Sequence, residues 1–291
     1  TPAESRPQVR RMANTPTNLP KKASPDTLSS MAISQQSITE FSWRLANALS
    51  ANPGRRLVLV PDSLSAAMLD KELRFFLGEA QESLLWPFPD WETLPYDRFS
   101  PHQDIVSDRL KTLYRLLHDE IGVLIVPVST IMHRLCPREY LLTHGLVLEK
   151  GQRLDLSALR KSLTDAGYRV VEQVNQHGEL AVRGSLLDVY PMGSEWPVRV
   201  DFFGDEVDAL RWFYPDTQRS VGKLEQVQIL PASECALTDE GITHFRNAWR
   251  STFEGAPSQA CVYQRVSEGD SPPGIEYFLP LFFKETATLL D

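Results

Sequence analysis

The chain has 291 residues, of which 42% are hydrophobic and 23% are charged, which is typical of folded proteins and corresponds to two or three compact units. Its net charge of −8 argues against nucleic-acid binding by the surface as a whole, and no apolar run approaches the ~20 residues that cross a membrane. No basic segment followed by an apolar one opens the chain, and Cys136, Cys235 and Cys261 are odd in number and far apart. We therefore expect a cytoplasmic protein without a disulfide framework.

The first thirty residues differ in composition from the rest. They contain five prolines and five Lys or Arg residues, with almost no large apolar side chains. Such a segment cannot bury enough surface to offset the entropy that is lost on ordering. We expect residues 1–30 to form a flexible basic tail.

From residue 37 onward, helices and strands are expected to alternate. The sequence SITE at 37–40 has the form of a capping box, and Asp62 and Ser63 can cap a second helix that ends near Gly78. The apolar run RLVLVP at 56–61 is typical of a parallel strand that is covered on both faces. The expected elements are helices at 38–49, 63–77 and 107–118 and strands at 56–61, 83–88 and 122–128. This alternation predicts a parallel α/β sheet with right-handed connections.

The run at 89–117 is a long loop that leads into the third of these helices. The loop carries Trp91, Tyr96 and Phe99 among three prolines. A loop of this length requires a function, or packing of its own, to stay ordered. Two interpretations are open from the residues: an Ω-like loop that its aromatic side chains hold down, and a functional loop.

The pattern changes near His144. Expected strands at 145–150, 168–174, 179–190, 197–203, 207–214 and 225–230 surround one helix at about 156–166, and Gly204-Asp205 is typical of a tight hairpin turn. These segments predict a small β-rich domain. After Pro231 the spacing is helical again over 238–253, and LLD at 289–291 has the character of a chain that is cut within a domain.

The strand VRVDFF at 198–203 offers a candidate interaction surface. If Val198 and Val200 face the core, alternation places Arg199 and Phe203 together on the opposite, polar face. An exposed aromatic residue beside an arginine is typical of protein-interface hot spots. The alternative, which the residues alone slightly favour, is that a neighbouring loop covers Phe203 and that Arg199 forms a surface ion pair.

A second strand, 178–191, contributes Arg183. Ala181 and Ser185 share its polar face, and Gly184 provides a place for a bulge. Side chains on a polar face are expected to be exposed. Replacing Arg199 or Phe203 by alanine should then change the free energy of unfolding by only about 0.5 kcal/mol.

Several long segments closely resemble, in the same order, the N-terminal region of the bacterial transcription-repair coupling factor. They are DWETLPYD, FSPHQDI, GVLIVPVSTIMHRLCP, HGELAVRGSLLDVYPMGSEWPVRVDFFGDEVDALRWF and GIEYFLPLFF. The resemblance extends over about 31–291 and implies the arrangement of the excision-repair protein UvrB. It implies an α/β domain 1a (31–143), an inserted β-rich α+β domain 2 (144–231) and the start of a truncated domain 1b (232–291). Domain 1a is then a parallel helicase-like sheet of the P-loop NTPase type in degenerate form.

Nucleotide chemistry is missing where this resemblance would place it. The expected position of a phosphate loop, 31–39, reads MAISQQSIT and holds neither glycine nor lysine, and no GxxxxGK[ST] or GxSxG occurs in the chain. His133 and Cys136 could form one side of a metal site, but no second pair of ligands exists. We expect no catalytic residue, no cofactor, no metal and no ATP hydrolysis in this fragment.

The resemblance implies an adaptor that recruits UvrA to RNA polymerase stalled at DNA damage. The residues that match the family's UvrA-binding positions are Arg183, Arg199 and Phe203, with Glu276 of the GIEY motif as a weaker candidate. RNA polymerase and double-stranded DNA would bind through domains absent from this chain, including an ATP-driven DNA translocase, and no membrane contact is expected. Two alternatives stay open: a UvrB-like damage-binding ATPase, and a plain nucleic-acid-binding domain that uses the basic tail and the aromatic residues.

Overall fold

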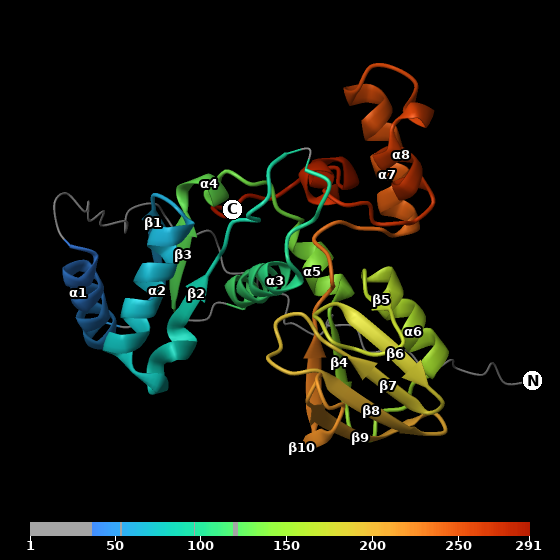
Figure 1. The fold of residues 1–291 in the computed structure, drawn as a ribbon, viewed down its shortest axis with the longest axis horizontal. Coiled ribbons are helices and arrows are strands. Elements are labelled where there is room, and N and C mark those ends of the chain that lie inside the picture. The colour runs from blue at the N-terminus through green and yellow to red at the C-terminus, as the bar shows by residue number, and fades with distance from the viewer. Residues whose placement is uncertain (1–36, 53, 96, 119–121) are drawn as a thin grey trace, which may run out of the picture. The chain divides into compact units, whose positions relative to one another are not determined.

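A computed structural model describes residues 37–52, 54–95, 97–118 and 122–291 of the chain. Their contacts divide them into two units, each of which is described by itself (Figure 1). The parallel-sheet unit holds the described residues up to Asp90 and those of 118–131, and the antiparallel-sheet unit holds 91–117 and 132–291. The expected basic tail and most of the 31–39 segment lie outside the described residues. Among the described helices, none has the length and apolar character that crossing a bilayer requires.

The parallel-sheet unit alternates helices and strands as the sequence predicts. Its elements are α1 (Ile38–Ala51), β1 (Arg56–Val60), α2 (Ser63–Leu77), η2 (Glu79–Leu84), β2 (Leu85–Pro87), β3 (Val123–Pro127) and α4 (Val128–Ile131). Strands β1 and β2 both pair in parallel with β3, which therefore lies in the middle of the sheet. The prediction of a parallel α/β sheet is confirmed, and a helicase-like P-loop fold stays a prediction.

Side chains cap both long helices of this unit. Ser37 Oγ accepts a hydrogen bond from the amide of Glu40, and Asp62 Oδ1 accepts one from the amide of Ser65 at 2.7 Å. These bonds satisfy amide groups that the first turn of a helix leaves without partners. The bond from Ser65 also lowers the pKa of the Asp62 carboxyl. The apolar sides of α1 and α2 then pack against the sheet in one buried cluster that includes Phe41, Leu49, Val58, Val60, Leu69, Leu73, Leu85, Val123 and Ile125.

The antiparallel-sheet unit contains a six-stranded sheet in the order β10-β9-β8-β7-β6-β5 and a two-stranded sheet of β4 and β11. Its strands are β4 (Leu146–Glu149), β5 (Arg169–Val170), β6 (Glu179–Arg183), β7 (Leu186–Val189), β8 (Val198–Phe203), β9 (Glu206–Phe213), β10 (Ser220–Leu224) and β11 (Gln226–Ile229). Its helices are α3 (Gln103–Leu117), α5 (Arg138–His144), α6 (Leu156–Asp165), α7 (Asp239–Thr252), η3 (Pro257–Gln259), α8 (Cys261–Ser267) and η4 (Ile275–Phe282). All neighbouring strands are antiparallel except β5 and β6.

Two expectations about this sheet are wrong. The single strand expected at 179–190 is a hairpin of β6 and β7, because Gly184 adopts a φ of +62° in a two-residue turn instead of a bulge. Ala181, expected on a polar face, is buried with Val174 and Phe213 in a small apolar cluster. Strand β10 has no counterpart among the expected strands. The hairpin turn expected at Gly204 is confirmed, with a φ of +64°.

The aromatic loop before α3 packs against the later part of its own unit. The Trp91 ring is buried, stacks on His133 with 4.5 Å between ring centroids and meets Tyr277 edge-on at 5.2 Å. Phe99 is exposed, and Tyr96 lies outside the described residues. The interpretation of an Ω-like loop held down by its aromatic side chains is therefore correct for Trp91 and wrong for Phe99.

Candidate protein-interaction surface

Strand β8 has the two faces that alternation predicts. Val198, Val200 and Phe202 are buried, whereas the side chain of Phe203 is 83% exposed. A register shift between Asp201 and Phe202 turns the end of the strand just before its hairpin. The alternative in which a loop covers Phe203 is wrong, because in the structure this ring stands in solvent at the sheet's rim.

A buried carboxylate organises the polar face beside β8. Asp188 of β7 is only 1% exposed, and it accepts hydrogen bonds from Arg199 Nε at 2.7 Å and Arg199 Nη2 at 2.8 Å. Arg183 Nη2 donates a third hydrogen bond to the same carboxylate. Cross-strand pairing explains the arrangement, because Asp188 lies directly opposite Arg199 in the ladder between β7 and β8. One Asp thus holds two arginines from the strands on either side of it.

Arg199 is held from several directions. Its guanidinium also donates from Nη1 to the Gln218 carbonyl at 3.2 Å and lies over the Phe213 ring at 4.9 Å. Its side chain is only 15% exposed. The hydrogen bonds to Asp188 raise the pKa of Arg199 above its ordinary value. The ion pair expected for Arg199 exists, but it is not a surface pair, and the expectation of an exposed Arg199 is wrong because Asp188 and Phe213 enclose it.

Gln218 reaches its position through an unusual backbone conformation. Its φ is +57°, a region that residues other than glycine rarely adopt. The side-chain amide of Gln218 donates to the carbonyls of Val174 at 3.0 Å and Pro215 at 2.7 Å. These bonds hold the turn that presents the Gln218 carbonyl to Arg199, so the orientation of Arg199 is set by residues on both sides of it.

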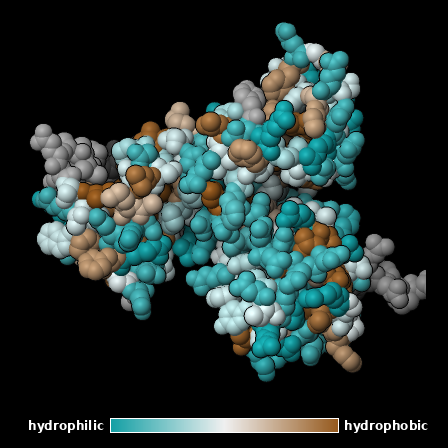
Figure 2. Space-filling view, viewed as in Figure 1, coloured by the Kyte–Doolittle hydropathy of each residue, from teal (hydrophilic) through white to brown (hydrophobic). Residues whose placement is uncertain are grey.

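Arg183 differs from Arg199 in its access to solvent. Its side chain is 48% exposed at the end of β6, and Asp188 is its one recorded partner among the described residues. A guanidinium has five N–H donors, so most donors of Arg183 stay available to another molecule. On the face that Figure 2 shows, hydrophobic residues are scattered among hydrophilic ones. The candidate surface thus consists of the exposed Phe203 ring and of Arg183, which Asp188 anchors and which solvent reaches.

Comparisons with known proteins place this surface in a defined family segment. Residues 146–235 match the family described as the UvrB interaction domain, and this segment includes Arg183, Arg199 and Phe203. The transcription-repair-coupling factor of Escherichia coli (strain K12) is 49% identical over 83% of this chain, and that of Haemophilus influenzae is 47% identical over 82%. That of Staphylococcus epidermidis is 32% identical over 69% of the chain.

The chain belongs to the transcription-repair-coupling factor family. It spans 21% of the length of the Escherichia coli and Haemophilus influenzae proteins and 17% of the Staphylococcus epidermidis protein. The match therefore concerns one part of a longer kind of protein.

Glu276 lies apart from the other three candidate residues of this family member. It belongs to η4, outside the matched segment, and its Oε2 accepts a hydrogen bond from Ser100 Oγ at 3.0 Å. Burial raises the pKa of its carboxyl above the ordinary value of 4.5. The structure thus brings Arg183 and Arg199 together on Asp188, places Phe203 on the same strand as Arg199, and connects Glu276 to the aromatic loop instead. A role for Glu276 in partner binding stays a prediction.

Two residues that matter for the surface were missing from the predicted site. Asp188 interrupts the apolar stretch LLDVY, and a single carboxylate in a buried strand is a signal that an arginine must lie opposite. Gln218 has no comparable signal, because its role depends on backbone conformation and on a carbonyl that sequence does not reveal.

Proposed function

We propose that this chain is the UvrA-recruiting adaptor module of transcription-coupled nucleotide excision repair. In this proposal it brings UvrA to RNA polymerase stalled at DNA damage, which places it in the bacterial cytoplasm. RNA polymerase and double-stranded DNA are bound by other parts of the longer protein, including an ATP-driven translocase. The observation that carries the proposal is the 83% exposed Phe203 on the same strand as Arg199, which shares the Asp188 carboxylate with Arg183, within the segment that matches the UvrB interaction domain.

An exposed aromatic ring and an anchored arginine each contribute to the binding of a protein partner. A large exposed aromatic ring is a typical hot-spot anchor, because burying it excludes water from the neighbouring polar contacts. Arg183 adds a planar fork that can pair with a carboxylate through two parallel hydrogen bonds. Because Asp188 already restricts both arginines, less conformational entropy is lost when a partner binds.

The proposed domains follow the family arrangement: 1a at 31–143, 2 at 144–231 and the start of 1b at 232–291. The matched segment at 146–235 supports the boundaries of the middle domain. The contact division is different in two respects: it groups 91–117 and 132–143 with the later residues, and it does not separate 144–231 from 232–291. We assign UvrA binding to the middle domain alone.

The proposal includes an inactive nucleotide site. The segment 31–39 has neither the glycines nor the lysine with which a phosphate loop holds a triphosphate. A ligand that does not bind cannot raise the melting temperature. We expect no thermal shift with millimolar Mg-ATP and no ATP hydrolysis by this chain, and a clear shift would support the UvrB-like ATPase instead.

The decisive test measures the affinity of purified UvrA for the chain and for Phe203→Ala. We expect a loss of roughly 30-fold, since truncating an interface anchor typically costs about 2 kcal/mol or more. Phe75→Ala is a matched control, because the Phe75 ring on α2 is 81% exposed but lies in the other unit. Both variants should melt close to the wild-type temperature. An unchanged affinity of Phe203→Ala, or a wild-type chain that does not bind UvrA, would contradict the proposal.

A further inference from the structure

Three cations form one row across the polar face of the sheet. Arg199 on β8 is the register partner of Arg211 on β9, and Arg211 is the register partner of Lys223 on β10. Side chains directly opposite each other in a ladder have Cβ atoms about 5 Å apart, and like charges at that distance are destabilising. Such a row requires negative charge from elsewhere.

The chain supplies that negative charge for two of the three cations. Asp188 pairs with Arg199, and Asp201 pairs with Arg211, whose side chain is still 38% exposed. Lys223 is exposed, and within the described part of the chain no carboxylate lies at ion-pair distance from it. The balance of charge along the row therefore becomes more positive toward the edge strand β10.

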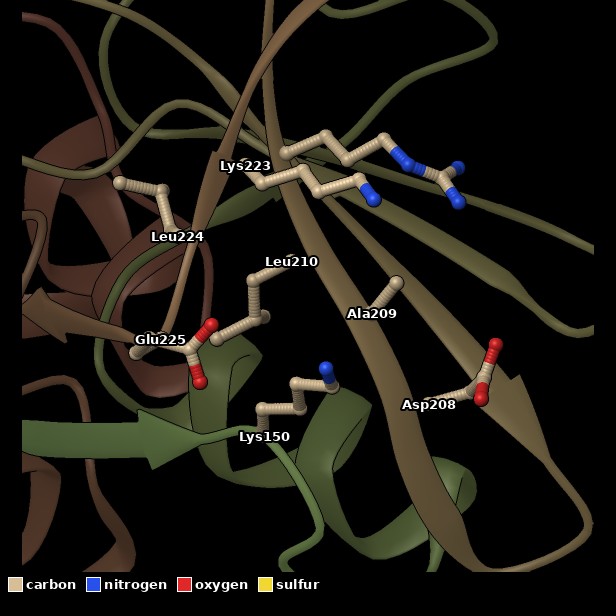
Figure 3. Close-up of a pocket in the computed structure, with 8 residues that line it drawn as sticks. Lys150, Asp208, Ala209, Leu210, Lys223, Leu224 and Glu225 are labelled. Carbon is tan, nitrogen blue, oxygen red and sulfur yellow. The ribbon is translucent and has the colours of Figure 1, made fainter.

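A hollow adjoins the outer end of this row. It has a volume of about 230 Å³ and is lined by residues of β9, the end of β10 and Lys150, which follows β4, with Leu210 and Leu224 in its wall (Figure 3). Arg211 and Lys223 contribute two further cations, and Asp208 and Glu225 contribute two acids. Lys150, like Lys223, has no ion-pair partner among the residues that the structure describes.

A stable interface needs more contact area than Arg183, Arg199 and Phe203 alone provide. A stable protein–protein interface buries about 800 Å² on each partner, contributed by roughly 20–30 residues. Phe203 and Arg183 stand at one end of the polar face, and the row from Arg199 to Lys223 continues that face to the free edge of the sheet. The row is the cationic continuation of the same surface.

We infer that Arg211 and Lys223 are further partner-contact residues, and that the partner meets them with acidic side chains, one of which enters the hollow beside Lys150. The inference rests on the proposed function and concerns the same partner, UvrA. A protein segment fits better than a nucleic-acid backbone, because Asp208 and Glu225 also line the hollow. A protein segment can place a hydrogen-bond donor or a cation opposite these two acids beside its own carboxylate, whereas a nucleic-acid backbone presents only phosphates. The net charge of −8 also opposes the attraction of a polyanion.

The test is a titration of UvrA against Lys223→Glu and Arg211→Ala at low and high salt. Lys223→Glu should weaken binding about tenfold or more, because a like charge then faces the partner's carboxylates, and the salt dependence of the affinity should decrease. Lys71→Glu, at an exposed position of α2 in the other unit, makes the same charge change as a control and should bind like wild type. Lys223 has no ion-pair partner to lose among the described residues, so this variant remains informative even if Arg211→Ala unfolds because Asp201 loses its partner.

The outcomes separate this inference from the proposed function. If Phe203→Ala weakens UvrA binding while Lys223→Glu and a folded Arg211→Ala bind like wild type, the cationic row is not a contact surface and the adaptor proposal stands. If the wild-type chain does not bind UvrA, both fail. If Lys223→Glu loses affinity for a double-stranded DNA oligonucleotide and keeps its affinity for UvrA, the row belongs to a nucleic-acid surface and the inference is overturned.

Discussion

Two arginine–carboxylate pairs in the antiparallel-sheet unit share their chemistry and differ in their surroundings. Arg109 Nε donates to Glu234 Oε1 at 2.7 Å, and both side chains are buried. Arg199 Nε donates to Asp188 Oδ1 at the same distance, but there a second arginine, Arg183, shares the carboxylate and reaches solvent. Both pairs have the same chemistry, so the exposure of an arginine to solvent decides whether the pair only holds the fold together or can also bind a partner.

The largest expected effect on stability comes from breaking the buried Arg109–Glu234 pair. Glu234→Ala leaves the Arg109 charge buried without its carboxylate, which typically costs about 3–5 kcal/mol. Unfolding in urea, followed by circular dichroism, should show this loss, with Glu268→Ala at an exposed position as the control. A loss below about 1 kcal/mol would mean that water reaches the pair and that the two regions are less different than their burial indicates.

Arg199→Ala should have the next largest effect. It removes two of the three hydrogen bonds to buried Asp188 and the cover over Phe213, so we expect a loss of about 1–3 kcal/mol in the free energy of unfolding. This value replaces the 0.5 kcal/mol that an exposed side chain would imply. A melting temperature equal to that of wild type would show that Arg183 alone can compensate Asp188.

Arg183→Ala should affect folding less and binding more. Arg199 still neutralises Asp188 in this variant, and a half-exposed ion pair contributes only about 0–1 kcal/mol. The affinity for UvrA should nevertheless fall, because the open guanidinium is the one that a partner carboxylate can reach. The ratio of binding loss to stability loss should be higher for Arg183→Ala than for Arg199→Ala. The reverse order would mean that Arg199 contacts the partner and that Arg183 mainly stabilises the fold.

The smallest expected effect is a pH dependence of the folding stability that comes from Glu276, whose carboxyl is influenced by Glu234 of the buried pair. Burial raises the pKa of Glu276, and nearby Glu234 adds to the rise. A carboxyl with a raised folded-state pKa contributes stability that is fully present below its unfolded pKa and is lost as pH rises through the folded value. The contribution of Glu276 to the free energy of unfolding should therefore fall as pH rises from about 4.5, and Glu276→Gln should remove this contribution from the slope of the stability curve. Equal slopes for both proteins would contradict the assignment.

The elements with clear periodicity could be predicted from sequence. The parallel strands read as apolar runs, but the expectation that β1 is covered on both faces is wrong, because Leu57 and Leu59 are exposed on one of them. The faces of β8 follow from strict alternation between Val198 and Phe203. The β6–β7 hairpin could not be resolved, because ELAVRGSLLDVY has β character on both sides of a turn of only two residues. Strand β10 was missed for the opposite reason: SVGKL is short, largely exposed and interrupted by Gly222.

The candidate site could be predicted only in part. The outward direction of Phe203 follows from period-two alternation along its own strand. The enclosure of Arg199 does not, because it depends on Asp188 across the ladder and on Gln218 in a turn with a left-handed backbone. Local pattern gives the direction of a side chain, whereas its exposure depends on what neighbouring strands place over it.

Hydrogen exchange of the chain with and without UvrA, followed peptide by peptide, tests the location of the UvrA surface most directly. We expect slower amide exchange in the complex at 198–210, which includes Phe203 and the β8–β9 turn, and at the end of β6 near Arg183. Exchange in α7 and α8 should stay unchanged. Protection confined to the aromatic loop at 91–102 or to η4 around Glu276, with none at 198–210, would place the UvrA surface elsewhere and contradict the central claim.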